Sequence, residues 1–133
     1  MTLVEVMVVL TVMAVLITFA VPFYEVAIEQ SRADIAAGNL RAIWSAQRFY
    51  WLENHAYTQD LTQLESLGLL DPAIVLSATG YVYSVTSASP GGFQAQATRA
   101  NGAWRGALTI DETGLVSGTL SSTGNRAIVP DFQ

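Results

Sequence analysis

The first 24 residues form an apolar run that contains one charged side chain, Glu5. Beyond that residue and Thr2, only Thr11, Thr18 and Pro22 interrupt the run. A helix of roughly 20 apolar residues spans the ~30 Å hydrocarbon core of a bilayer. The pattern therefore predicts a transmembrane helix over residues 1–24.

Glu5 is unfavourable in such a segment, because a carboxylate at the middle of a membrane is disfavoured by about 2.5–3.5 kcal/mol. One interpretation is that the chain uses this charge for a function. The other is that Glu5 lies close enough to the helix end to reach the lipid headgroups. We favour the first, and the charge becomes the first candidate site residue.

Residues 25–52 continue the helix as an amphipathic segment, with apolar residues at helical spacing. The face that carries Leu40, Trp44 and Tyr50 is expected to pack on the rest of the fold. Polar residues such as Glu29 are expected to point in other directions.

Two positions are expected to bend this long helix, Pro22 and Gly38. Proline removes a hydrogen-bond donor and its ring clashes with the carbonyl of Thr18, four residues earlier. We therefore expect a kink or a short melted stretch between about Ala14 and Pro22, where a threonine hydroxyl can satisfy freed backbone groups. Gly38 marks either a second, gentle bend or a plain packing contact.

Residues 53–80 are predicted to form a connecting region with one short helix. Asp60 is a suitable N-cap, with Gln63 three residues later, and Gly68 is a suitable C-terminal stop. Three leucines share one face of this helix and are expected to dock on a sheet: Leu61, Leu64 and Leu67.

From residue 81 onward, apolar and polar residues alternate with a period of two, as in strands that bury one face. Turn residues separate four short strands of an antiparallel meander at 89–92, 101–102 and 111–114. Residues 121–133 add either a short strand or an irregular tail. The chain thus predicts an α+β fold: a long N-terminal helix, bent or partly melted near Pro22, packed on a small antiparallel sheet within residues 81–133.

Composition fits one domain of modest size. The 133 residues are 51% hydrophobic and 13% charged, with six arginines, no lysine and eleven carboxylates for a net charge of −5. An acidic chain attracts nucleic acid weakly, so such a role would need a local patch around Arg99 and Arg105, and we predict no specific nucleic-acid binding. No cysteine is present to form a disulfide or a thiolate metal site.

The apolar run differs from a secretory signal peptide. No Lys or Arg precedes Arg32, and no small-residue cleavage site closes the run. We therefore expect the segment to be retained. A chain that begins flush with its own hydrophobic run also looks like a product already trimmed at its N-terminus, although Met1 could be an initiator.

A family resemblance rests on about the first 25 residues. The run begins Met1-Thr2-Leu3-Val4-Glu5-Val6-Met7-Val8-Val9 and ends at Pro22. Glu at position 5 and Pro at position 22 closely resemble the mature N-terminus of type IV pilins and of the related pseudopilins. The chain departs from the family where it begins with Met1 instead of Phe and has Ala14 where Gly is frequent. The later residues are similar only in architecture.

This resemblance implies a subunit made as a membrane prepilin with a short leader ending in Gly. A prepilin peptidase would remove the leader and methylate the new N-terminus, Met1. The subunit would wait in the inner membrane and then polymerise with copies of itself into an extracellular filament, with the help of the pilus assembly machinery. Residues 1–24 would form the filament core, and Glu5 would pair with the α-amino group of Met1 on a neighbouring subunit.

Two functions stay open: the structural subunit of a type IV pilus, serving adhesion, motility or DNA uptake, and a pseudopilin of a type II secretion system. A single-span membrane protein with a binding domain is less favoured, because of the Glu5 and Pro22 motif. We predict no enzyme activity, cofactor or metal. The lone histidine, His55, is expected to be a solvated residue after the helix. Asp111 and Glu112 are expected to serve a turn rather than to bind Ca²⁺ together with Asp131.

Overall fold

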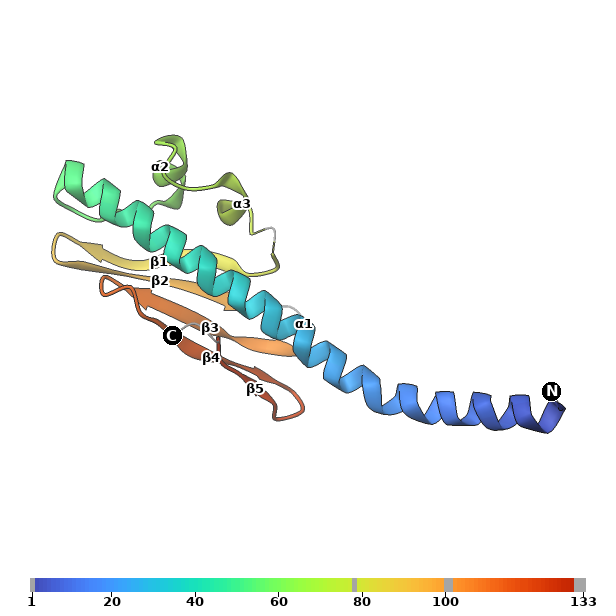
Figure 1. The fold of residues 1–133 in the computed structure, drawn as a ribbon. Helices are drawn as coiled ribbons and strands as arrows, with labels where there is room; N and C mark the ends of the chain where they lie inside the picture. The colour runs from blue at the N-terminus through green and yellow to red at the C-terminus, as the bar shows by residue number, and fades with distance from the viewer. Residues whose placement is uncertain (1, 78, 100–101, 131–133) are drawn as a thin grey trace.

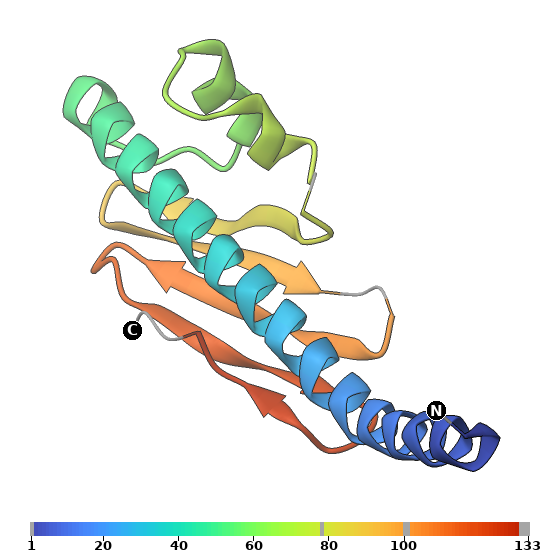
Figure 2. The ribbon, with the colours of Figure 1, turned by 45° about the vertical axis from the view of Figure 1, so that its right-hand side comes forward.

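The computed structural model describes residues 2–77, 79–99 and 102–130, and it confirms the α+β architecture. Helix α1 (Leu3–Asn54) lies across one face of a five-stranded antiparallel sheet, and its N-terminal part extends beyond the sheet (Figures 1 and 2). At 1.5 Å per residue, a helix of 52 residues is about 78 Å long. We call residues 25–130 the head and residues 2–24 the apolar segment.

The sheet follows chain order, and each strand is antiparallel to the next. Its strands are β1 (Val82–Ser89), β2 (Gly92–Arg99), β3 (Trp104–Asp111), β4 (Val116–Ser122) and β5 (Ala127–Ile128). The four predicted strands are confirmed, and of the two alternatives left for the C-terminal region the short strand is the one found.

A register shift interrupts the pairing of β1 with β2 between Val85 and Ser87. The hydroxyl of Thr86 donates to the carbonyl of Gln94 at 3.0 Å at this point. The alternation of apolar and polar residues does not predict this register shift, because the shift depends on one extra residue in one of two paired strands.

The core lies between α1 and the facing side of the sheet. Leu40 is fully buried, and Trp44 and Tyr50 pack partly buried against the core, as the helical spacing predicted. The helix contributes mainly small side chains, and the sheet contributes larger ones: Ala33, Ala36, Ala37, Leu40, Ile43 and Ala46 face Phe93, Leu108, Ile110, Val116 and Leu120. The alanines allow the helix backbone to come close to the sheet while the interior stays densely packed.

One polar residue was assigned to the wrong side of the helix. Glu29 was expected to point away from the core, but only 2% of it is exposed. It lies four residues before Ala33 and seven before Ala36, so it shares their buried face. The helical spacing of Glu29 from these alanines predicts that it is buried, whereas its charge suggested the opposite, and the spacing is the better guide here.

The connecting region contains two short helices, α2 (Leu61–Ser66) and α3 (Pro72–Val75). Leu61 and Leu64 are buried as expected, whereas Leu67 is 51% exposed, so the three-leucine face is wrong at its last member. The helix ends at Ser66, and Gly68 adopts a left-handed φ of 71° that turns the chain away before a third contact forms.

Helix α3 was not predicted. Asp71 caps it by accepting a hydrogen bond from the amide of Ala73 at 2.8 Å, and Pro72 occupies its first turn. Proline favours that position because its missing N–H would have no helical partner there. The Asp-Pro pair was therefore a signal for a helix start.

Helix α1 runs unbroken through Pro22, so no melted stretch occurs between Ala14 and that residue. The helix changes direction where it leaves the sheet, as Figure 1 shows. The hydroxyl of Thr18 donates to the carbonyl of Ala14 at 2.9 Å, and not to the group that the proline frees. Such a back-bond to the preceding turn favours bending.

Gly38 is exposed, and a Cβ atom placed on it would meet no atom within 4 Å. A packing contact within the chain therefore does not explain this glycine. Its role in a helix bend stays a prediction.

Candidate assembly site

The apolar segment is the most exposed hydrophobic surface of the chain. Helix α1 contains a stretch near the N-terminus that is long and apolar enough to cross a membrane, and none of that stretch is buried. The exposed side chains include Leu3, Met7, Leu10, Leu16, Ile17 and Phe19. A surface of this size on a helix signals burial in a membrane or against other protein.

Glu5 lies in the first turn of α1, where it completes a capping box. The amide of Glu5 donates to the hydroxyl of Thr2, and the amide of Thr2 donates to the carboxylate of Glu5, both at 3.4 Å. Sequence reasoning missed this pairing, although Thr followed three residues later by Glu is its usual signature. The carboxylate therefore has a local role at the helix start.

The other predicted site residues lie apart from Glu5. Met1 lies outside the described residues, so its predicted pairing and N-methylation stay predictions. Pro22 is about 25 Å further along the helix by residue count, and Gly38 is about 50 Å from the N-terminus. The motif residues thus form a series along one helix and not a cluster.

The apolar segment meets the head at a junction formed by the turn between β4 and β5. Arg126 in that turn donates from its guanidinium to the carbonyl of Pro22 at 3.1 Å. Close by, the side-chain amide of Gln30 donates to the carbonyl of Val129 at 3.0 Å. The residues on either side of β5 are therefore tied to the helix close to the point where the apolar segment ends.

A buried ionic cluster lies further along the same interface. The carboxylate of Glu29 accepts hydrogen bonds from Nε of Arg99 at 2.9 Å and from the hydroxyl of Tyr81 at 3.1 Å. Arg32, one turn along the helix, reaches the second oxygen at 3.4 Å. Arg99 also donates to the carbonyl of Gly80 at 2.9 Å.

Burial of the phenol, and then the charge of Glu29, raise the pKa of Tyr81 above its usual range. The hydroxyl therefore stays a proton donor to the carboxylate. Each member of the cluster is satisfied by its neighbours, which is the condition for keeping an ion pair in an apolar interface.

At the opposite end of the head, α1 holds two hairpin turns through its tryptophans. The indole N–H of Trp44 donates to the carbonyl of Glu112 at 3.0 Å, and that of Trp51 donates to the carbonyl of Pro90 at 3.1 Å. The side-chain amide of Gln47 clamps the backbone of Thr58 with bonds of 2.6 and 3.0 Å. Trp44, which was expected to pack on the rest of the fold, thus also supplies a specific hydrogen bond.

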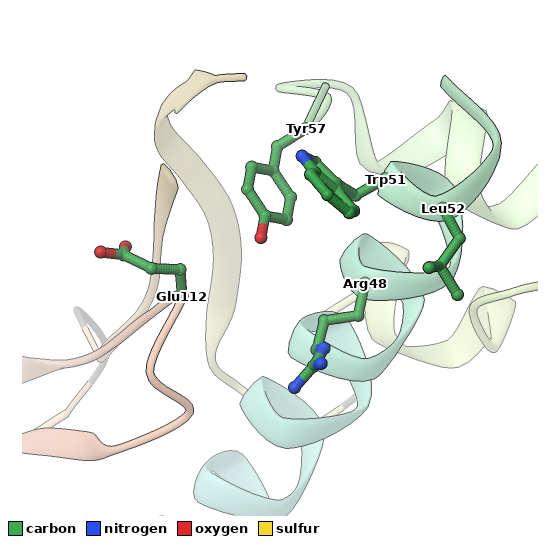
Figure 3. A pocket seen from close by; sticks show the side chains of 5 residues that line it. All are labelled: Arg48, Trp51, Leu52, Tyr57 and Glu112. Carbon is green, nitrogen blue, oxygen red and sulfur yellow. The ribbon is translucent and has the colours of Figure 1, made fainter. Parts of the chain in front are cut away.

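A cavity of about 290 Å³ opens beside these contacts. Its lining comprises Arg48, Trp51, Leu52, Tyr57 and Glu112. Figure 3 shows the two aromatic rings side by side, with Glu112 across from them on the hairpin and Arg48 on the helix. The guanidinium of Arg48 lies 5.0 Å from the centre of the Trp44 ring.

Of the residues that were considered as possible ligands, the two that the structure describes have roles in the local backbone structure. His55 is exposed and ends α1 in a left-handed conformation with φ of 54°. Asp111 accepts a hydrogen bond from the amide of Thr113 at 2.9 Å, as its predicted turn role requires. Asp131, the third residue considered for calcium, lies outside the described residues.

The chain matches no protein-family model and no curated protein. The architecture itself, a long apolar N-terminal helix packed on a small antiparallel sheet, is compatible with the pilin fold.

Proposed function

We propose that this chain is the structural subunit of a type IV pilus filament. The observation that carries the proposal is an exposed apolar helical segment whose only charged side chain among residues 2–24 is Glu5. The sheet packs on the later part of the same helix, so the apolar segment is left bare for other partners. The resemblance of the N-terminal motif to pilins supplies the identity of the filament.

Each subunit is stored in the inner membrane, with the apolar segment in the lipid and the head outside. Assembly transfers this segment into a bundle of equivalent helices from other copies. Both surroundings are apolar, so the transfer changes little hydrophobic area and stays reversible. The leader peptidase and the assembly machinery are the remaining partners, and the product is an extracellular filament for adhesion, motility or DNA uptake.

Glu5 sets the register of the bundle by pairing with the α-amino group of Met1 on a neighbouring subunit. Removing one partner from such a buried pair leaves an uncompensated charge, whereas the pair gains little over an apolar substitute. The pair therefore specifies position more than it adds stability. The capping bonds to Thr2 supply a local partner for the carboxylate before assembly.

The first prediction is that Glu5→Ala abolishes filaments while the head stays folded and the chain stays in the membrane. Electron microscopy of filaments sheared from cells measures the yield, and mass spectrometry identifies the subunit and a methylated N-terminus. Long fibres made mainly of this chain support a pilus. Short fibres that form only with a secretion machine support the pseudopilin alternative.

Thr2→Val is the matched control, because it removes the capping hydroxyl and keeps the carboxylate. If Glu5 acts only as a helix cap, both variants lose filaments to a similar extent. If Glu5 registers neighbouring subunits, Thr2→Val still polymerises. Abundant ordered filaments from Glu5→Ala would remove the intersubunit pairing from the proposal.

A further inference from the structure

Another cavity, of about 290 Å³, lies at the junction between the apolar segment and the head, where α1 leaves the sheet (Figure 1). We call it the junction cavity. Its lining comes from the helix, from the start of β3 and from the end of β4 with the turn that follows, and it includes Pro22, Glu25, Trp104, Ser122, Thr123 and Arg126. The cavity therefore lies between the helix and the head at the point where the apolar segment begins.

The junction cavity lies at the depth of lipid headgroups when the apolar segment spans a membrane. Residues 3–22 of a helix cover about 30 Å, which is the thickness of the hydrocarbon core. Pro22 then lies at the boundary of the hydrocarbon, and Glu25 lies about 5 Å above it, within the headgroup layer. Phe23 and Tyr24 are exposed at this level, where aromatic side chains anchor membrane helices. The membrane thus brings phospholipid headgroups to the cavity.

The lining carries one charge of each sign, and the two charges do not pair with each other. Glu25 is exposed and, among the residues that the structure describes, has no hydrogen bond or ion pair. Arg126 is exposed and donates to the carbonyl of Pro22, which leaves other N–H groups of its guanidinium free. Both charges are therefore open to a ligand.

Two hydroxyl groups add hydrogen-bond donors to the lining. The hydroxyl of Ser122 accepts a hydrogen bond from the amide of Gly124 at 3.2 Å, so its own hydrogen can still be donated. Thr123 is exposed, and its hydroxyl has no partner within the described ranges of the chain. Hydroxyls and a guanidinium together suit a phosphate, whereas the carboxylate of Glu25 suits a cation. A ligand that satisfies the whole lining carries a phosphate and an ammonium close together.

We infer that the junction cavity binds the headgroup of a phosphatidylethanolamine molecule of the membrane. The phosphate pairs with Arg126 and accepts hydrogen bonds from Ser122 and Thr123, and the ammonium donates to the carboxylate of Glu25. The inference rests on the part of the proposed function that stores the subunit in the membrane. It adds a lipid that holds the head against the membrane surface until the apolar segment moves into the filament.

Lipid retention by the full chain tests the site. The chain is placed in nanodiscs with equal amounts of phosphatidylethanolamine, phosphatidylcholine and phosphatidylglycerol, and native mass spectrometry identifies the lipid that stays bound after release. Phosphatidylcholine has no N–H donor for Glu25, and phosphatidylglycerol has no ammonium. Phosphatidylethanolamine is expected to be retained roughly tenfold more often than either, a factor that one charge-assisted hydrogen bond can supply.

Substitutions of the two charged residues separate the two halves of the site. Glu25→Lys is expected to reverse the preference toward phosphatidylglycerol, because a cation replaces the partner of the ammonium, and damage to the fold would not produce such a reversal. Arg126→Gln is expected to lower the retention of all three lipids roughly tenfold. Glu53→Lys and Arg105→Gln are the matched controls, since they make the same changes outside the cavity lining, and they are expected to keep the wild-type pattern.

A photocrosslink locates the bound lipid, and the lack of cysteine in the chain permits it. Thr123→Cys is labelled with benzophenone maleimide and irradiated in the same nanodiscs. An adduct with phosphatidylethanolamine is expected. Ser117→Cys, near the other end of β4, is the control and is expected to give no lipid adduct.

The outcomes separate this inference from the proposed function. A chain that enters the nanodiscs but shows no preference among the three lipids overturns the site and leaves the filament proposal standing. A chain that enters no bilayer overturns the membrane storage and the site with it. A preference for phosphatidylethanolamine that Glu25→Lys reverses, together with the adduct at residue 123, supports the site.

Soluble phosphoethanolamine carries the same two charged groups and is the other source of this chemistry. Saturation of the chain by that compound in detergent micelles, with no lipid preference in nanodiscs, overturns the assignment to a lipid. Weak binding of the soluble compound together with selective retention of the lipid supports it.

Discussion

Glu5 and Glu29 are carboxylates on the same helix that meet opposite surroundings. Glu5 is exposed and has only local capping bonds to Thr2, whereas Glu29 is buried and held by Arg99, Tyr81 and Arg32. The first therefore remains available to a group outside the chain. The second is committed to fastening α1 on the sheet. Position along the helix, and not residue type, decides between these roles.

At the same scale, Arg99→Ala is expected to destabilise the head strongly. The substitution leaves Glu29 buried with a weaker set of partners, and breaking a buried ion pair costs about 3–5 kcal/mol. Urea unfolding of the full chain in detergent, followed by near-UV circular dichroism, measures the loss. Arg105→Ala is the control from the same sheet, and it is expected to change the free energy of unfolding by less than about 0.5 kcal/mol. Equal effects from the two substitutions would contradict a fastening role for the cluster.

Replacing glycine by alanine is expected to change the free energy of unfolding in opposite directions at Gly38 and at Gly114. Gly38→Ala is expected to raise the free energy of unfolding by about 1 kcal/mol, because alanine favours the helix and the new Cβ meets nothing. Gly114→Ala is expected to lower it, because φ is 82° and the Cβ would lie 2.9 Å from the ring of Trp44. Thermal unfolding of both variants measures the difference. If Gly38→Ala loses stability, the helix is strained at that position in a way its contacts do not reveal.

At the scale of elements, α1 is one uninterrupted helix whose first part is exposed and apolar and whose later part packs on the sheet. Pro22 lies at the change between them, and the helix continues through it, with the guanidinium of Arg126 bonded to the carbonyl of that residue. Among the connecting elements, α2 depends on its cap, since it has only six residues. Short helices gain little from propagation, so the capping bonds weigh heavily in their stability.

The stability that the Asp60 cap gives to α2 is expected to depend on pH. Hydrogen bonds from the hydroxyl and then the amide of Thr62 lower the pKa of Asp60 below 3.8. A lowered folded pKa means that the cap stabilises above the unfolded pKa and is lost as the pH falls through the folded one. The difference in Tm between wild type and Asp60→Asn should therefore be larger at about pH 6 than at about pH 2. A difference that does not change with pH would contradict ionic capping.

At the scale of the whole molecule, the sequence predicted the layers better than the contacts between them. Periodicity was enough to place the long helix and four strands, because each follows from which residues are apolar and how they are spaced. The cluster of Glu29 with Arg99 could not be found in this way, since its members are 70 residues apart and the pairing depends on how the sheet folds back. The capping box of Thr2 and Glu5, by contrast, could be predicted from the sequence, because its two residues are only three positions apart.

For the candidate assembly site, the sequence predicted only the two motif residues, Glu5 and Pro22. Glu5 and Pro22 stood out because a charge and a proline are rare in an apolar run. The cavity beside Trp51 was not predictable, since Arg48, Tyr57 and Glu112 come from a helix, a loop and a hairpin turn that the fold alone brings together. Asp111 and Glu112 were expected to serve the turn, and only the structure places Glu112 at the rim of a cavity.

The course of α1 across the sheet has a mechanical consequence. Contacts from the helix to the rest of the head occur at intervals along its length, at Gln30, Trp44 and Trp51. A pull on the N-terminal end acts along the helix axis, parallel to the sheet surface that it crosses (Figure 2). The contacts are then loaded together in shear rather than peeled one after another. A head attached to its helix in this way resists tension along the helix axis until several of these hydrogen bonds fail together.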